Sequence, residues 1–178
     1  MWKNYNKYRV LKVFFDDPLP KGGFHLREIG RLTKLAPKSV GIYLGELIKE
    51  GLIVKEPHRA HNYPVYHANR DNEFFRLYKK LDLLASLHEA GIVNVLYDEF
   101  SPECIVLFGS ASRGEDVKES DIDIFIETKE QKTDLSRFEK KLGRKISLFF
   151  NADFQELSPE LKNNIVNGAI LKGYLKAY

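Results

Sequence analysis

Apolar residues recur at the spacing of helix faces through the first 50 residues of the chain. Pro37 suits the first turn of the last of these helices and Gly51 suits its end. Two earlier helices are predicted, one that ends before Asp16 and one from Leu26 to Leu35. The clearest apolar set falls at positions i, i+3, i+4, i+7 and i+8 of the third helix: Val40, Tyr43, Leu44, Leu47 and Ile48.

Two short apolar runs after the third helix, Leu52–Val54 and Val65–His67, predict a β-hairpin. Helix, helix, tight turn, helix and hairpin is the order of a winged helix-turn-helix domain, which we expect over residues 1–68. The segments Phe24–Ile29 and Leu44–Ile53 resemble the second and third helices of small prokaryotic transcription regulators of this class.

This resemblance implies contacts with double-stranded DNA, since in such regulators the third helix enters the major groove and the wing touches the backbone or minor groove. Gly41 and Gly45 depart from the usual pattern, because they supply no side chain to DNA and disfavour the helix. A winged helix used for dimerisation or partner binding therefore stays open as an alternative. The implied DNA-binding residues are Arg27, Arg31, Lys38, Ser39, Ile42, Arg59 and His61.

A single amphipathic helix is predicted between the two ends of the chain, within residues 69–90. An apolar stripe on a connecting helix favours packing over solvation, so we expect this helix to join two modules or to pack between the subunits of a homodimer. The stripe consists of Phe74, Leu77, Tyr78, Leu81, Leu84 and Ala85.

The C-terminal region, residues 91–178, alternates short apolar strands with helical stretches and carries the candidate chemistry. The buried-type strand Cys104–Phe108 runs directly into Gly109 and Ser110, and ten residues later come Asp121 and Asp123 within a second apolar strand. Because side chains alternate along a strand, both carboxylates are predicted on one face, with Cα atoms about 6 to 7 Å apart.

Two carboxylates held this close repel each other unless a cation joins them. Mg²⁺ binds one or two carboxylates together with phosphate oxygens. Gly109 allows the backbone to approach a phosphate closely, and Ser110 offers a hydroxyl and an N–H group. The pattern therefore predicts a site for a nucleoside triphosphate and Mg²⁺.

The same region resembles the minimal nucleotidyltransferase domain of the DNA polymerase beta superfamily. The segments that carry the resemblance are Ile105–Ser110, Ser120–Ile124 and Leu142–Leu148. Together with the N-terminal winged helix, they are similar to a group of prokaryotic, especially archaeal, two-domain proteins. The resemblance implies transfer of a nucleoside monophosphate from an NTP to a hydroxyl, with release of pyrophosphate.

In this family Gly109 and Ser110 would hold the triphosphate, and Asp121 and Asp123 would be the catalytic carboxylates that bind two Mg²⁺ ions. Arg113 is a further candidate for nucleotide binding, and Lys118 a less specific one. Other family members carry a third carboxylate on a later strand, where this chain has Ser147. Serine is a weak Mg²⁺ ligand and no general base near pH 7, so Asp134, Glu139 or Asp153 would have to substitute.

Charge divides the chain in the same way as the apolar pattern does. Residues 1–70 carry 13 Lys and Arg against 6 Asp and Glu, whereas residues 71–178 carry 15 against 19. A basic N-terminal module suits a polyanion. The single cysteine, Cys104, excludes an internal disulfide framework, and the cluster His58, His61 and His67 has too few acidic neighbours for a zinc site. No apolar run is long enough to cross a membrane, so a cytoplasmic setting is expected.

These observations predict an α+β protein with a winged helix-turn-helix domain, a linker helix and a nucleotidyltransferase-like mixed sheet flanked by helices. The expected boundaries are 1–68, 69–90 and 91–178. The first hypothesis is a Mg²⁺-dependent nucleotidyltransferase. The alternatives are a DNA-binding regulator whose second domain only binds a nucleotide or acts as a scaffold, and an antitoxin-like partner protein.

Overall fold

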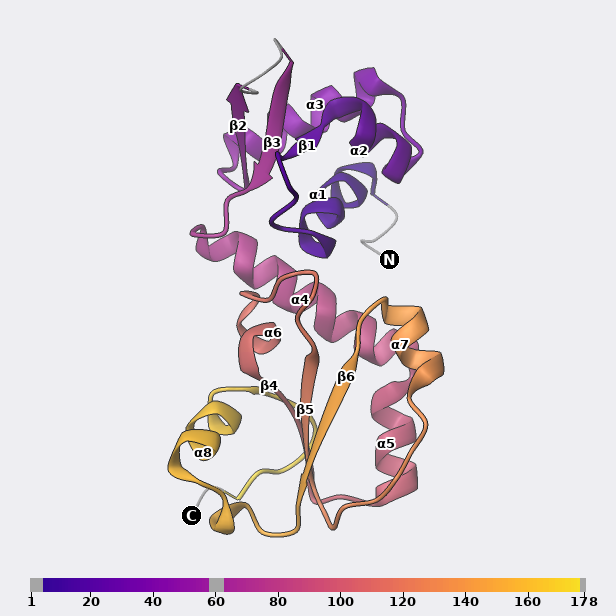
Figure 1. The fold of residues 1–178 in the computed structure, drawn as a ribbon, viewed down its shortest axis with the longest axis vertical. Helices are drawn as coiled ribbons and strands as arrows, with labels where there is room; N and C mark the ends of the chain where they lie inside the picture. Colours follow the sequence, from indigo (N-terminus) through magenta and orange to yellow (C-terminus); the bar gives the residue numbers. More distant parts are fainter. Residues whose placement is uncertain (1–4, 58–62, 177–178) are drawn as a thin grey trace. The chain divides into compact units, whose positions relative to one another are not determined.

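The computed structural model describes residues 5–57 and 63–176 and confirms the α+β class. The chain forms two compact units, residues 1–79 and 80–178, and the boundary between them falls inside one long helix (Figure 1). None of the helices described is long and apolar enough to cross a membrane.

The N-terminal unit consists of three helices and a three-stranded antiparallel sheet. The helices are α1 (Asn6–Asp16), α2 (Leu26–Thr33) and α3 (Pro37–Lys49). The strands are β1 (Phe24–His25), β2 (Ile53–Pro57) and β3 (Pro64–Ala68), in the order β1-β3-β2. The strand β1 is too short to show in the sequence pattern, and it exists because it pairs with β3. Helices followed by a small antiparallel sheet are consistent with a winged helix-turn-helix, which stays a prediction.

Local signals explain the limits of α2. The side chain of Glu28 accepts a hydrogen bond from the backbone N–H of His25, which caps the helix start. Lys34 then adopts a left-handed conformation (φ +55°) and ends the helix two residues earlier than the apolar pattern predicts.

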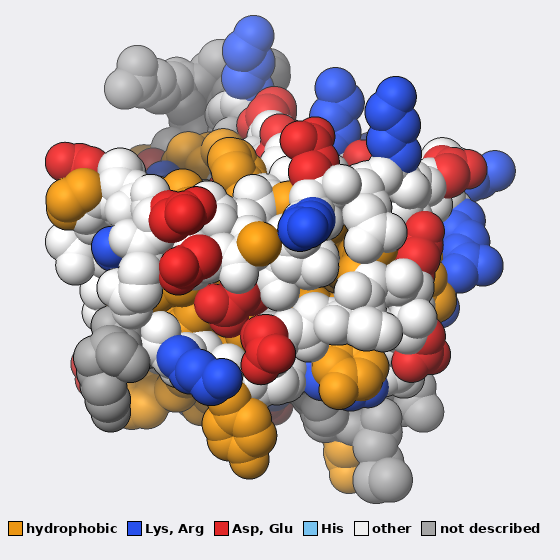
Figure 2. Space-filling view, turned by 90° about the horizontal axis from the view of Figure 1, so that it is seen from below, with side chains coloured by type: hydrophobic (Ala, Val, Ile, Leu, Met, Phe, Trp, Pro, Cys, Tyr) orange, Lys and Arg blue, Asp and Glu red, His pale blue; other side chains and the backbone are white. Residues whose placement is uncertain are grey.

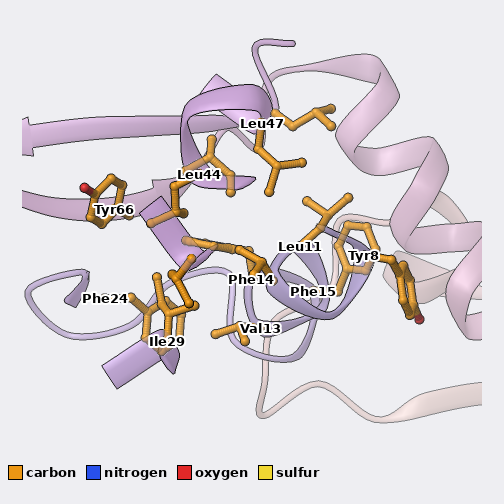
Figure 3. Packing of buried hydrophobic residues seen from close by; sticks show 14 of the residues in the cluster. Tyr8, Leu11, Val13, Phe14, Phe15, Phe24, Ile29, Leu44, Leu47 and Tyr66 are labelled. Carbon is orange, nitrogen blue, oxygen red and sulfur yellow. The ribbon is translucent and has the colours of Figure 1, made fainter. Parts of the chain in front are cut away.

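A dense aromatic core holds this unit together (Figure 3). Phe14 of α1 is completely buried and packs edge-on against Phe24, with 5.4 Å between ring centroids. Leu44 and Leu47 of α3 enter the same cluster, as the periodicity predicts. Burying rings of this size provides much of the hydrophobic stabilisation of so small a unit.

The long helix α4 (Glu73–Ala90) contributes to both cores rather than standing free. Phe75 packs in the N-terminal core against Phe15, and Leu87 is buried in the C-terminal one. In the first half of the helix, most of the predicted stripe is exposed within the single chain, and the neighbouring Phe75 is the buried side chain instead. The exposed members of the stripe are Phe74, Leu77, Tyr78 and Leu81.

The C-terminal unit is built on a four-stranded mixed sheet in the order β6-β5-β4-β7. Figure 1 labels three of its strands, β6, β5 and β4. Strand β4 pairs antiparallel with β5 and β7, and β5 pairs parallel with β6. The strands are β4 (Cys104–Phe108), β5 (Ile122–Glu127), β6 (Ile146–Asn151) and β7 (Ala169–Gly173).

Helices cover the two faces of this sheet unequally. Helices α5 (Ile92–Phe100) and α7 (Ser136–Leu142) pack on one face with the end of α4. The 3₁₀ turn η2 (Phe154–Glu156) and α8 (Pro159–Val166) cover part of the other. Strand alternation places Asp123 on this second, partly covered face, together with Phe108 and Phe125.

The burial of α4 can be tested at two adjacent phenylalanines. Phe75→Ala is expected to lower the free energy of unfolding by about 3 to 5 kcal/mol, because Phe75 is 1% exposed and leaves a cavity. Phe74→Ala is the matched control, since Phe74 is 51% exposed, and should cost about 1 kcal/mol or less. Urea denaturation measures both. Equal losses would mean that α4 buries a different face.

Candidate functional site

The connection from β4 into the next helix brings the backbone close to the acidic strand. Strand β4 is buried along its whole length and leads directly into α6 (Gly109–Arg113). Gly109 has a φ of +71°, which disfavours any other residue, and the hydroxyl of Ser112 donates to the Gly109 carbonyl (2.8 Å). Because α6 has only five residues, its dipole contributes little, and Ser110 would act through its own hydroxyl and N–H.

Antiparallel pairing of Phe108 with Asp123 sets the two halves of the site side by side. A Cβ atom built on Gly109 would lie 2.5 Å from Oδ2 of Asp123, closer than any side chain tolerates. The missing side chain at Gly109 therefore makes room for the carboxylate. Residues that sequence analysis linked only by spacing, Gly109 and Asp123, are neighbours in the fold.

The second carboxylate lies next to the residue that replaces the expected third acid. Asp121 is exposed just before β5, and the hydroxyl of Ser147 donates to Oδ2 of Asp121 (3.2 Å). In the parallel pair β5–β6, Ser147 is the register partner of Asp123. Asp121, Asp123 and Ser147 therefore occupy one corner of the sheet.

The electrostatics of this corner suit a cation. Partial burial raises the pKa of Asp123, the charge of Asp121 raises it further, and Arg144 opposes both effects. A carboxylate that is costly to ionise beside a like charge gains most from a bound cation. Together with the space left at Gly109, these two carboxylates fit Mg²⁺, which prefers oxygen ligands.

Arg144, which sequence analysis did not single out, makes three hydrogen bonds next to the two carboxylates. Arg144 donates from Nε to the Ser120 carbonyl (2.9 Å) and from Nη2 to the Asp121 carbonyl (3.0 Å). Its Nη1 pairs with Oδ2 of Asp116 (2.6 Å), whose side chain is only 3% exposed. Neither residue stands out in the sequence. Asp116 is one of several acids in its loop, and Arg144 belongs to the segment Leu142–Leu148, which was noted only for its resemblance to the nucleotidyltransferase domain.

Comparison with known families identifies this unit. Residues 90–175 match the family model described as "Polymerase beta, Nucleotidyltransferase". This part of the chain is a polymerase beta-type nucleotidyltransferase domain. Neither the curated proteins nor the solved structures contain a match to the chain. Domains of this family typically use Mg²⁺ and an NTP.

The three acids considered as substitutes for the expected third carboxylate each accept a hydrogen bond from a backbone N–H group. Asp134 accepts from the Ser136 N–H (2.9 Å) at the start of α7, a bond that lowers the pKa of Asp134. Glu139 accepts from the Ile146 N–H (3.0 Å), and Asp153 caps η2 through Gln155. Among residues 5–57 and 63–176, no group of three or more His, Cys, Asp or Glu is arranged to hold a metal.

The two basic residues considered for phosphate binding lie at the end of α6 and in the loop that follows it. Arg113 is exposed at the end of α6 and pairs with Glu115 (Nε to Oε2, 2.8 Å). Lys118 is exposed in the loop that follows. The roles of both side chains towards phosphate stay predictions.

The opposite end of the nucleotidyltransferase domain is acidic. Burial raises the pKa of Glu127 at the end of β5, and the charges of Glu103 and Asp153 raise it further, while Lys176 opposes them. Figure 2, which views the molecule from this end, shows Asp and Glu side chains gathered across the surface. Lys and Arg side chains stand among and around them in the same view.

The predicted DNA-binding residues of the N-terminal unit lie on two helices. Arg27 and Arg31 are exposed on α2, while α3 presents Lys38 and a 56% exposed Ile42. Ser39 is half-buried in the first turn of α3. The remaining two, Arg59 and His61, lie outside the described residues.

Of the three histidines His58, His61 and His67, the structure describes His67. Nε2 of His67 lies 3.6 Å from Oε2 of Glu56 across the β2–β3 hairpin. This contact accounts for a polar side chain at position 67. The other two members of the cluster, His58 and His61, fall outside the described part of the chain.

Proposed function

We propose that the C-terminal domain binds a nucleoside triphosphate with Mg²⁺ and transfers the nucleoside monophosphate to a hydroxyl of an acceptor. The observation that carries the proposal is the position of Gly109 directly beside the Asp123 carboxylate, with Asp121 at the same corner. A backbone turn without a side chain accommodates phosphates, and the two carboxylates accommodate the cations that accompany them.

In this proposal each residue contributes binding and orientation. Gly109 and Ser110 hold the phosphate tail through backbone N–H groups and the serine hydroxyl. Asp121 and Asp123 hold the Mg²⁺ ions, which neutralise the charge that develops on the transferred phosphoryl group. Holding the phosphates in one orientation accounts for most of such catalysis, since little covalent chemistry is left to the protein.

The first test is thermal unfolding with each of the four NTPs, with and without Mg²⁺. A ligand at 100 times its Kd stabilises the folded state by about 2.7 kcal/mol. Such a gain raises the midpoint temperature of unfolding measurably. We expect such a rise only when Mg²⁺ is present. The variant Asp121→Asn/Asp123→Asn should lose it, because amides bind Mg²⁺ poorly.

The control is Asp98→Asn/Glu99→Gln on α5, which removes the same number of negative charges from exposed positions outside the site. It should keep the full shift. An absence of any shift in the wild type, with all four NTPs, would contradict the proposed nucleotide site.

A second candidate function, nucleotide binding without transfer, is favoured by Ser147. Its hydroxyl donates to Asp121, where a third carboxylate would accept a proton or bind the catalytic cation. Serine near pH 7 does neither, so the acceptor hydroxyl would lack a base. The chain would then be a regulator that senses a nucleotide or uses the domain as a scaffold.

Restoring the acid separates the two candidates. With water in place of the unidentified acceptor hydroxyl, we expect Ser147→Asp to increase hydrolysis of Mg²⁺–NTP to NMP and pyrophosphate by about 10²-fold or more, the usual contribution of a general base. Ser147→Ala is the matched control and should stay at the wild-type rate. A wild-type rate that already equals that of Ser147→Asp would rule out the binding-only candidate.

We also propose that the N-terminal unit binds double-stranded DNA through α2 and α3. Support comes from the exposed cations Arg27, Arg31 and Lys38 and from the excess of basic residues in this part of the chain. Exposed lysine and arginine on neighbouring helices suit phosphate contacts, while Ser39 and Ile42 offer the base contacts.

The DNA proposal predicts a salt-dependent affinity that depends on these cations. Lys38→Gln should weaken binding to every duplex tested and reduce the slope of log K against log[salt] by about 1. Lys12→Gln on α1 serves as the control, because its charge is already paired with Asp16. Fluorescence anisotropy at several salt concentrations measures both slopes. An unchanged slope for Lys38→Gln would exclude Lys38 from the proposed DNA interface.

Two further expectations stay predictions. The exposed side chains Phe74, Leu77, Tyr78 and Leu81 of α4 support the homodimer, since a row of large apolar groups gains from a partner. The antitoxin-like role rests on the family resemblance alone.

A further inference from the structure

We propose that Arg144 is a positioning residue that holds the Asp121 carboxylate in place for the metal ion, with Asp116 as its buried counter-charge. The proposal rests on the proposed function of the same site, since it assigns a role towards the Mg²⁺ that Asp121 and Asp123 would bind. Arg144 itself touches neither the phosphates nor the metal in this proposal. It acts through the backbone of the loop that carries Asp121.

The contacts of Arg144 concentrate on this loop. Residues 114–121 connect the end of α6 to the start of β5, and they therefore join the phosphate-binding turn to the metal carboxylates. Arg144 donates to the carbonyls of Ser120 and Asp121, the two residues that immediately precede β5. One side chain thus fixes the backbone at the point from which the Asp121 side chain leaves.

The burial of Asp116 indicates that its ion pair with Arg144 has a role beyond stability. Asp116 is 3% exposed and lies 2.6 Å from Arg144. A buried ion pair costs desolvation that often cancels its attraction, so stability alone is a weak reason for the pair. The guanidinium of Arg144 can donate to several acceptors at once, and Asp116 supplies the negative charge that balances it.

Arginine is specifically suited to this task. Its planar guanidinium donates in fixed directions, here from Nε, Nη1 and Nη2 to three acceptors. A lysine at position 144 could keep the ion pair with Asp116, but its single nitrogen could not reach both carbonyls as well. Arg144→Lys therefore removes the positioning contacts while it keeps the charge, which makes it the decisive variant.

The experiment measures Mn²⁺ binding to the full chain by the loss of the free Mn²⁺ signal in electron paramagnetic resonance. Inorganic tripolyphosphate without metal is titrated in parallel by calorimetry. Arg144→Lys is expected to weaken Mn²⁺ binding about tenfold or more, with an unchanged unfolding midpoint and unchanged tripolyphosphate affinity. Arg144→Gln also removes the charge, so it should weaken the binding of both probes.

Arg137→Gln is the matched control, because Arg137 is an exposed arginine of α7 that stacks on the Phe138 ring and is not part of the site. It should bind Mn²⁺ as the wild type does. If Arg144→Gln fails to fold, Arg144→Lys still decides the question, since its ion pair remains. Wild-type Mn²⁺ affinity in folded Arg144→Lys would overturn the positioning role alone. Failure of the wild type to bind Mn²⁺ would overturn both this role and the proposed metal site.

Discussion

The antiparallel pairing of Phe108 with Asp123 is the contact on which the rest of the site depends. It brings the end of β4, and therefore Gly109, next to the carboxylate of the neighbouring strand. The register is held by burial, since Ile122 and Ile124 on either side of Asp123 are completely buried on the helix-covered face. A shift by one residue would expose these isoleucines and bury the carboxylate, so the apolar core fixes the position of the polar site.

The second strand pairing determines what kind of chemistry the corner supports. Parallel pairing of β5 with β6 places Ser147 opposite Asp123 and within hydrogen-bonding distance of Asp121. Because Ser147 is uncharged, two carboxylates repel each other there instead of three. The hydrogen bond from Ser147 satisfies one oxygen of Asp121, so the replacement is compatible with a folded and ordered corner.

Much of the site could be predicted because its main signals are local. Gly109 and Ser110 directly follow one apolar strand, and Asp121 and Asp123 lie at the start of another, where alternation predicts both acids on one face. Arg144 could not be predicted in the same way, since its three acceptors come together only when β6 lies beside β5. The α+β class followed from the strand and helix patterns, whereas the mixed sheet was implied by the resemblance to the nucleotidyltransferase domain.

Two features of the fold depend on contacts that the sequence pattern does not contain. Strand β1 has two residues, and it forms only because β3 offers a pairing edge. In the first half of α4, the periodicity correctly identified residues that share one apolar face. However, this helix contributes side chains to both the N-terminal and the C-terminal core. The N-terminal core takes Phe75, which lies outside the predicted stripe, and leaves Phe74 exposed. Periodicity reports which residues share a face, whereas only tertiary packing decides which face is covered.

In the proposed function, nucleotide binding and nucleotidyl transfer depend on different strands. The parts proposed to hold phosphates and metal come from β4, α6 and the start of β5, whereas the group that would activate an acceptor comes from β6. Under this proposal, a serine in place of the carboxylate on β6 would affect transfer but not the proposed nucleotide contacts. Arg144 lies just before the same strand, and its guanidinium donates to the loop before β5. The start of β6 therefore holds the backbone next to Asp121, although β6 has a serine where an acid was expected.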